Sequence, residues 1–518
     1  MEKTIPIPVP VGGERGDLAP YEIPPNAMRK CQNMIRSDTG TLILRPGYKV
    51  TSGTQPGTRI MGLYYFRTAS ETEKSVAMTQ TGWWQHDGTN WVDISGTALA
   101  GSTTQVGRFA VFPQSGTYRL IGVNGQGADN YWDGAAATYS ALGGSPSVAV
   151  DVKVSANRVL LLVKPNTVQI SEFNNSDSWP LSTTLPDSGD IMIGMERLGR
   201  AAVGIVGDSS QWVGRAQTGS FPFRFERVDE KPGTLSAATM LSDGLATYYL
   251  GEDGIIYRFD NVGVSIASEA MKRFVIENLD YTNRGMSHGF YNRTYRVLVW
   301  LFPSVGSGSP DKGVYYDLRT GAMGRVVFGG TITASASWKT VTTLTWEDLS
   351  AYTWDTIGVD FPTWDTFGRK GEKKELLGDS SGKVHVFGQG DGSDNGATVE
   401  GIWEHGLFPA GGLDKNFLPQ TFETLFKKTS NSIRAEVSLL ASKTLMAEPT
   451  QSENVNIDLS IDQRNDVDLS RLAQPEGETR FVGIRHRIST QVGPVEWYGG
   501  LLHGESTEIE RGPTNEDS

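Results

Sequence analysis

A repeated pair of short strands is the feature that most constrains the fold of this 518-residue chain. From about residue 59, an apolar run leads to a turn with glycine or asparagine, and a second run with aromatic or β-branched residues follows. These second runs are Gly82–Asp87, Asn130–Gly134, Thr167–Ile170, Gln211–Gly214, Gly254–Phe259, Gly313–Asp317 and Gly382–Phe387. The first five recur roughly every 40–47 residues, which is typical of one β-propeller blade per repeat. The sequence therefore predicts an all-β fold with a β-propeller of six or seven blades over residues 59–397.

The turns between these runs have the composition that hairpins require. The chain contains 61 glycines among 518 residues, against a usual share of roughly 7%. In Tyr248–Tyr257 and in Leu376–His385, an apolar run meets a polar turn flanked by glycines, and a β-branched run returns. Glycine and aspartate tolerate the backbone angles of such turns. The glycine excess therefore indicates many short strands rather than long helices.

After about residue 398 the pattern becomes a plain series of strands. The expected strands are Thr398–Trp403, Thr421–Phe426, Ile433–Leu440, Val455–Leu459, Arg480–Ser489 and Val495–Leu502. Within the fifth, the alternation of Val482, Ile484, His486 and Ile488 with other residues predicts one buried face. We therefore expect a β-sandwich platform over residues 398–504 and a flexible polar tail over residues 505–518.

The first 58 residues are expected to form an extended arm that joins the platform. Seven prolines up to Pro46 disfavour helices and central strands in this segment. The exceptions are one or two helical turns within Asn26–Ile35 and a short strand at Thr41–Leu44.

One helix is expected in the propeller region, over residues 269–279. Ser268 is a suitable N-cap, and Met271, Phe274, Val275 and Leu279 form one apolar stripe. We expect this helix to pack beneath the propeller or between the domains.

A tryptophan-rich insertion interrupts the last repeat over residues 338–370. It carries the tripeptide Trp-Asp-Thr twice, beginning at Trp354 and at Trp364. Such loops can stack on a sugar ring, but tryptophan more often packs on protein. We therefore interpret Trp354 and Trp364 as a contact with another subunit or a partner.

The charge of the chain restricts its partners. With 47 basic and 59 acidic residues, the formal net charge of −12 argues against a protein that grips nucleic-acid phosphates. The single cysteine, Cys31, excludes an internal disulfide. No apolar run approaches the roughly 20 residues that span a bilayer, and Met1–Pro10 lacks the pattern of a targeting signal.

No pattern of catalytic or ligand-binding residues stands out. Gly378–Gly382 matches G-x-S-x-G, but a strand-like run follows where a nucleophile serine needs a helix. The six histidines include no pair at zinc-helix spacing, and His385 and His486 are expected in strands as packing or edge residues. Asp391, Asp394 and Asn395 lie in a glycine-rich loop that we expect to be solvated rather than to bind calcium. We expect no enzymatic activity, no cofactor and no bound metal.

Several short motifs, taken in order, resemble one family. They are Ile23-Pro24-Pro25-Asn26-Ala27, Cys31-Gln32-Asn33-Met34, Gly40-Thr41-Leu42, Leu44-Arg45-Pro46-Gly47-Tyr48, the Leu377–Val384 hairpin, Phe481–Arg487 and Val495–Gly500. Together with a degenerate propeller, this arrangement resembles the nozzle or DNA-stabilization (tail hub) proteins of podovirus-like phages. The resemblance covers most of the chain in organisation but only these stretches in residues.

The resemblance implies a structural protein of the virion tail, assembled in the host cytoplasm. Such proteins form six-fold rings that contact the portal, the adaptor and other tail proteins. They surround the channel that retains the packaged genome and passes DNA during ejection. An acidic wall would repel phosphate, so DNA would pass without specific binding.

Two alternatives stay open at the level of sequence. A propeller that binds or hydrolyses host surface glycans would need only two carboxylates for hydrolysis, which 59 acidic residues cannot identify. A binding hub without a channel is the other alternative.

Overall fold

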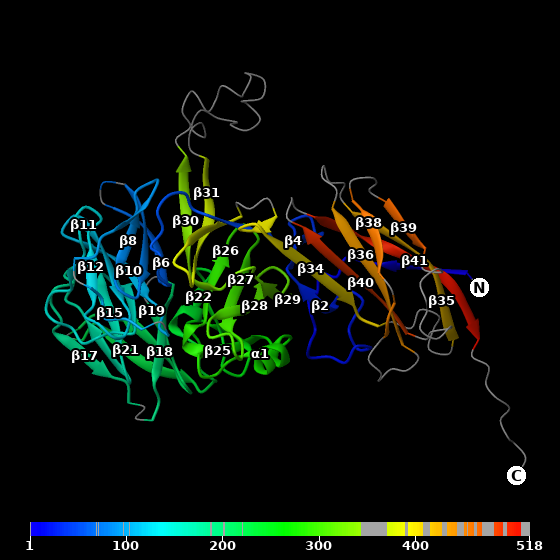
Figure 1. The fold of residues 1–518 in the computed structure, drawn as a ribbon. Helices are drawn as coiled ribbons and strands as arrows, with labels where there is room; N and C mark the ends of the chain where they lie inside the picture. Colours follow the sequence, from blue (N-terminus) through cyan, green and yellow to red (C-terminus); the bar gives the residue numbers. More distant parts are fainter. Residues whose placement is uncertain are drawn as a thin grey trace, which may run out of the picture.

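Seven antiparallel four-strand units follow one another along the chain and form the blades of a β-propeller, of which the first five are separate sheets and the last two belong to one larger sheet. The propeller and the neighbouring platform are drawn in Figure 1. The computed structural model describes residues 2–342, 370–388, 392–407, 415–426, 433–442, 450–459, 464–468, 481–490 and 495–508, without residues 69, 71, 97, 103, 187–188, 200–201, 220 and 453. Blades one to three are β6 (Ile60–Arg67), β7 (Glu73–Thr79), β8 (Trp83–His86), β9 (Trp91–Asp93); β10 (Arg108–Gln114), β11 (Thr117–Val123), β12 (Asn130–Trp132), β13 (Ser140–Ala141); and β14 (Asp151–Ser155), β15 (Arg158–Val163), β16 (Thr167–Ile170), β17 (Leu181–Thr184).

The remaining four blades continue the same order. They are β18 (Met192–Leu198), β19 (Ala202–Gly207), β20 (Gln211–Ala216), β21 (Phe223–Asp229); β22 (Leu241–Ser242), β23 (Thr247–Leu250), β24 (Ile256–Phe259), β25 (Val264–Ser268); β26 (His288–Asn292), β27 (Val297–Pro303), β28 (Pro310–Asp317), β29 (Met323–Val327); and β30 (Ile332–Thr342), β31 (Lys370–Asp379), β32 (Val384–Phe387), β5 (Tyr48–Val50). The first strand of each blade contacts the first strand of the next, and β30 contacts β6, so the ring closes around an axis. The propeller therefore has seven blades.

The last blade takes its outer strand from the N-terminal arm. β5 pairs antiparallel with β32, with Tyr48 opposite Phe387 and Val50 opposite His385. The chain thus begins and ends the propeller in one sheet, and hydrogen bonds rather than a covalent link hold the ring closed.

Two packed sheets form the platform beside the propeller (Figure 1). One contains β2 (Met28–Gln32), β34 (Ala397–His405), β36 (Arg434–Ser442), β37 (Thr450–Gln451), β38 (Val455–Asp458) and β40 (Phe481–Thr490). The other contains β1 (Glu2–Ile7), β3 (Met34–Arg36), β4 (Leu42–Leu44), β35 (Lys415–Phe426), β39 (Arg464–Asp468) and β41 (Glu496–Glu508). Their core is aromatic: the Trp403 and Trp497 ring centroids are 5.4 Å apart, and those of His486 and Phe422 are 5.6 Å apart. The platform is a β-sandwich.

The N-terminal arm belongs to both units. β1 and β4 pair with β41 of the platform, whereas β5 pairs with β32 of the propeller. β2 pairs antiparallel with β34 and also touches β29 in parallel, with Gln32 opposite Arg325. The short strand β33 (Ser393–Asp394) links β34 to β5. The expected helical turns within Asn26–Ile35 are wrong, because this segment pairs with β34 as β2 and with β4 as β3.

The expected helix is shorter than predicted. α1 spans Lys272–Asn278 and begins after Met271, which gives no side-chain cap. Ser268 lies at the end of β25, opposite Ile256, so the chain is still extended there. Met271, Val275 and Leu279 are buried, so the predicted apolar stripe is confirmed. The other helical turns in the described residues are the 3-10 turns η1 (Ala237–Thr239) and η2 (Arg284–Met286). No helix in the described ranges is long and apolar enough to cross a membrane.

Two expected boundaries move because strands run further than the sequence suggested. β30 continues to Thr342 and β31 begins at Lys370, so both ends of the expected insertion belong to a hairpin of the last blade. β41 continues to Glu508, so the first residues of the expected tail pair with β35. Residues 509–518 lie outside the described part of the chain.

Candidate functional site

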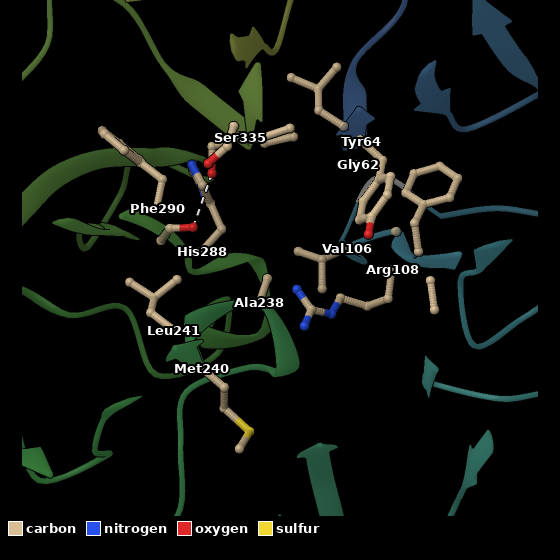
Figure 2. A pocket seen from close by; sticks show the side chains of 18 of the residues that line it. Gly62, Tyr64, Val106, Arg108, Ala238, Met240, Leu241, His288, Phe290 and Ser335 are labelled. Carbon is tan, nitrogen blue, oxygen red and sulfur yellow. Dashed lines mark hydrogen bonds between the residues drawn. The ribbon is translucent and has the colours of Figure 1, made fainter. Parts of the chain in front are cut away.

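A cavity of about 630 Å³ lies on the propeller axis. Every first strand of the ring contributes to its wall, and several of the lining side chains are drawn in Figure 2. One lining residue from each strand, in chain order, is Tyr64, Arg108, Lys153, Glu196, Leu241, Phe290 and Ser335. Because side chains alternate along a strand, neighbours of these residues point into the cores between blades. In β18, Glu196 lines the cavity whereas Met195 is buried among apolar side chains.

Charged groups from blades two to four form a network along one wall. Arg108 Nε donates to Asp151 Oδ1 at 3.1 Å, and Lys153 Nζ donates to Glu196 Oε2 at 2.8 Å. Arg108 Nη2 lies 3.6 Å from the same Glu196 oxygen. Burial raises the pKa of Glu196, but the charges of Lys153 and Arg108 outweigh it, so its pKa is lowered overall. Each of the two carboxylates is thus paired with a basic side chain of the same wall.

The opposite wall, from blades five to seven, combines apolar side chains with hydroxyl and arginine side chains and with one buried histidine. Ala238, Met240 and Phe290 lie there together with His288 (Figure 2). His288 is 2% exposed, and neither ring nitrogen has a hydrogen bond of ordinary geometry among the described residues, although the Met286 backbone lies beside the ring. Burial, together with the charge of Arg59, lowers the pKa of His288 to about 3, against the opposing effect of the Met286 backbone. The imidazole is therefore neutral at physiological pH, with one donor and one acceptor available.

The cavity is basic although the chain is acidic. Its lining contains Arg108, Lys153, Arg197 and Arg293 but only one acidic residue, Glu196. A second hollow of about 330 Å³ shares Val106 with the first and includes Lys164, Arg284 and Asp208 in its lining. The axis thus has the opposite sign to the net charge of −12, which favours anions there.

The residues predicted for sites from the sequence are not at this cavity. Trp354 and Trp364 lie outside the described residues, so their proposed contact stays a prediction. Gly378–Gly382 forms the turn between β31 and β32, as expected, and Ser381 Oγ donates to Asp379 Oδ1 at 2.8 Å. His385 and His486 are buried in strands, which confirms the strand position and favours packing over an edge position. His385 Nε2 also lies 2.9 Å from Asp379 Oδ2.

The expectation that Asp394 lies in a solvated loop is wrong. Asp394 is 3% exposed, and its Oδ1 accepts from Arg45 Nη1 at 2.9 Å. Its Oδ2 accepts from the Gly329 backbone at 2.7 Å. Both carboxylate oxygens therefore have protein partners and do not form a calcium loop. Among the residues described, no three His, Cys, Asp or Glu side chains are grouped as a metal site would require.

The cavity residues were not found from the sequence. Arg108, Lys153, Glu196 and His288 occur singly on four different strands, and nothing in their local spacing distinguishes them from surface residues. Only the closed ring brings them to one axis. A signal existed in the predicted propeller itself, since the first strand of each blade lines the axis.

Comparison with known proteins gives fold similarity only. No protein-family profile matches the chain, and no curated protein matches it. BamB from Moraxella catarrhalis is similar at 10% identity and a TM-score of 0.37, over 68% of this chain and 92% of that one. The WD40 β-propeller domain of Doa1 is similar at 10% identity and a TM-score of 0.38, over 66% of this chain and 97% of that one. Raptor from Chaetomium thermophilum is similar at 9% identity and a TM-score of 0.40, over 66% of this chain and 29% of that one.

Proposed function

We propose that this chain is a structural subunit of a short phage tail and forms the nozzle that retains the packaged genome and passes DNA during ejection. The observation that carries the proposal is where the resembling motifs lie. Residues 23–48 contain β2, β3, β4 and the first residue of β5, and among these β2 and β5 join the propeller to the platform. Phe481–Arg487 lies in β40, and Val495–Gly500 leads into β41. The N-terminal motifs that resemble the tail nozzle family thus lie in the joint between the two units, and the C-terminal ones lie in the platform.

The joint connects the propeller and the platform at several places, as a structural protein under mechanical force requires. The strands β2, β5 and β33 connect both units through backbone hydrogen bonds, so the propeller and platform are not linked by a single flexible segment. Glu14 adds a buried side-chain link, because it accepts from Arg325 Nε of β29 at 2.8 Å and from the Cys31 backbone of β2 at 2.9 Å. Because the two units are firmly connected, each subunit can pack as a single body in a ring.

In this proposal, DNA passes between subunits and not along the axis of a propeller. The axial cavity holds the volume of roughly twenty water molecules at about 30 Å³ each. The major groove of B-DNA alone is about 12 Å wide, so a duplex does not fit there. The basic lining would also attract phosphate rather than release it. A bore between subunits would instead present outer surfaces of a chain whose net charge is −12.

Loss of the protein from particles tests its role in retaining DNA. Particles assembled without this chain are expected to lose their packaged genome, which nuclease protection measures. Addition of the purified protein to freshly assembled particles is expected to restore protection. Full protection without the chain would contradict the proposal.

The glycan alternative has one supporting feature, the axial cavity with polar side chains in its lining. Hydrolysis of host surface polysaccharide by the purified protein would favour this alternative. The platform would then serve as an attachment to the particle.

The proposed partners of the nozzle are further copies of the chain, the portal, the adaptor and other tail proteins.

A further inference from the structure

The buried imidazole of His288 is the observation from which a binding site follows. A buried polar group without a partner costs roughly 1–3 kcal/mol, so such groups are usually satisfied by protein, solvent or a ligand. Neither nitrogen of His288 has a hydrogen bond of ordinary geometry among the described residues, although the Met286 backbone lies beside the ring, and the residue lines the axial cavity. A molecule in the cavity can supply an acceptor and a donor to this ring.

The opposite wall and one opening supply positive charge. Figure 2 shows Arg108 and His288 on opposite sides of the cavity. Arg108 and Lys153 are compensated by Asp151 and Glu196. Arg197 and Arg293 are exposed and form no ion pair within 4.0 Å among the described residues, although the charge of Arg293 acts on the buried carboxyl of Glu375. A ligand with an anionic group would meet these two arginines without displacing an existing ion pair.

Hydroxyl groups on the wall indicate what else the ligand carries. Ser335 Oγ donates to the Gly289 carbonyl at 3.0 Å, and Thr333 Oγ1 donates to the Ile60 carbonyl at 2.6 Å. Both oxygens keep lone pairs, so they accept hydrogen bonds from a ligand. A ligand that donates as well as accepts fits these groups and His288 better than a simple inorganic anion does.

We propose that the axial cavity is a binding site for a small hydroxylated organic anion, of the class of uronic acids and sugar phosphates. The anionic group lies toward Arg197 and Arg293, and hydroxyl groups bind His288 and Ser335. The volume of about 630 Å³ is within the roughly 300–1,000 Å³ of small-molecule sites. This binding activity goes beyond the proposed structural function and does not depend on it.

Calorimetric titration of the full chain with four probes tests the proposal. The probes are glucuronate, glucose 6-phosphate, glucose and inorganic phosphate, each up to about 10 mM. At least one of the two sugar anions is expected to bind one molecule per chain. Glucose and inorganic phosphate are expected to bind at least about tenfold more weakly. The stronger sugar anion identifies the anionic group as carboxylate or phosphate.

Variants locate the site. His288→Leu is nearly isosteric and is expected to weaken binding about tenfold, the loss of one hydrogen bond. Arg197→Gln, at an exposed position that tolerates change, is expected to weaken binding about three- to tenfold. Arg224→Gln is the matched control, because Arg224 is 70% exposed on β21 and does not line the cavity. Thermal unfolding checks that each variant folds. If His288→Leu does not fold, Arg197→Gln alone tests the site.

Three results would overturn the proposal. The first is no binding of either sugar anion at the highest concentration. The second is binding of glucose or inorganic phosphate as tight as that of the sugar anions. The third is unchanged binding in the folded variants at positions 288 and 197.

Discussion

Arg45 and Asp394, 349 residues apart in the chain, form an ion pair in which both side chains are 3% exposed or less. Arg45 Nε also donates to Asn33 Oδ1 at 3.0 Å, and its guanidinium lies 4.4 Å from the centre of the Phe328 ring. The pair thus fixes the arm, the sixth blade and β33 to one another. Arg45 belongs to the R-P-G motif, so the physical reason for that motif is the joint between the propeller and the platform.

Removal of one partner of this pair is expected to destabilise the protein strongly. Arg45→Met leaves Asp394 buried with its charge uncompensated, which typically costs about 3–5 kcal/mol. Urea unfolding measures the change. Arg273→Ala is the matched control, because its pair with Glu277 on α1 is exposed and worth about 0.3–0.5 kcal/mol. Equal effects of the two substitutions would contradict the assigned role of Arg45.

Gly47 of the same motif is expected to tolerate no side chain. A Cβ atom there would lie 1.9 Å from the Ser393 carbonyl oxygen, so β5 and β33 would have to separate. Gly47→Ala is therefore expected to lower the free energy of unfolding by about 1–3 kcal/mol or more. Gly285→Ala is the control, since nothing lies within 4 Å of its added Cβ. Thermal unfolding of both variants checks this, and a Gly47→Ala protein as stable as the control would refute the close approach.

The platform is expected to lose stability as the pH falls from about 6.5 to about 4. Burial lowers the pKa of His405 to about 4, and burial and the neighbouring His405 lower that of His486. In the unfolded chain both rings take up a proton near pH 6.5, whereas the folded state keeps them neutral. The unfolded state therefore binds more protons in this window, and the stabilisation is complete only above it. For His405 alone, the free energy of unfolding is expected to fall by roughly 3 kcal/mol across this window, at about 1.36 kcal/mol per pH unit.

Chemical unfolding at several pH values measures this dependence. His486→Leu places an apolar side chain of similar size next to Trp403 and removes the titrating ring, so it is expected to reduce the loss of stability at low pH. His503→Gln is the control, because His503 is partly exposed on β41 and hydrogen-bonded to Thr4 Oγ1. If wild type and His486→Leu lose stability in parallel, the buried histidines are not the cause.

The two Trp-Asp-Thr tripeptides are expected to act in assembly rather than in folding. Replacement of Trp354 and Trp364 by alanine should weaken association between subunits or with a partner, while the unfolding temperature changes little. Sedimentation of assembled particles and thermal unfolding of the free chain give the two readouts. Unchanged assembly would refute this interpretation.

The local part of the fold could be predicted from the sequence. All seven predicted return runs lie at the third strand of a blade, from β8 to β32, and each of the six predicted platform strands overlaps a strand of the structure. These segments can be recognised because apolar and polar residues alternate within them and because the turn residues that bound them are adjacent in sequence. Closure of the ring by β5 could not be predicted, because Tyr48 and Phe387 are distant in sequence and no local pattern specifies their pairing.

The candidate site depends on such distant pairings throughout. From its sequence neighbours alone, Asp394 is expected in a loop, and only the fold places it next to Arg45. In the same way, His288 is expected to be an ordinary strand residue. The basic character of the axis also contrasts with the acidic composition, which averages over the whole surface. Composition therefore described the exterior of this chain and not its central cavity.

The nozzle proposal is tested most directly by electron microscopy of particles that contain this chain. It predicts a six-fold ring of two-lobed subunits with the bore between them, and with each propeller axis beside the bore rather than along it. Separate monomers on the particle, or an assembly of this chain without a bore, would contradict the proposal.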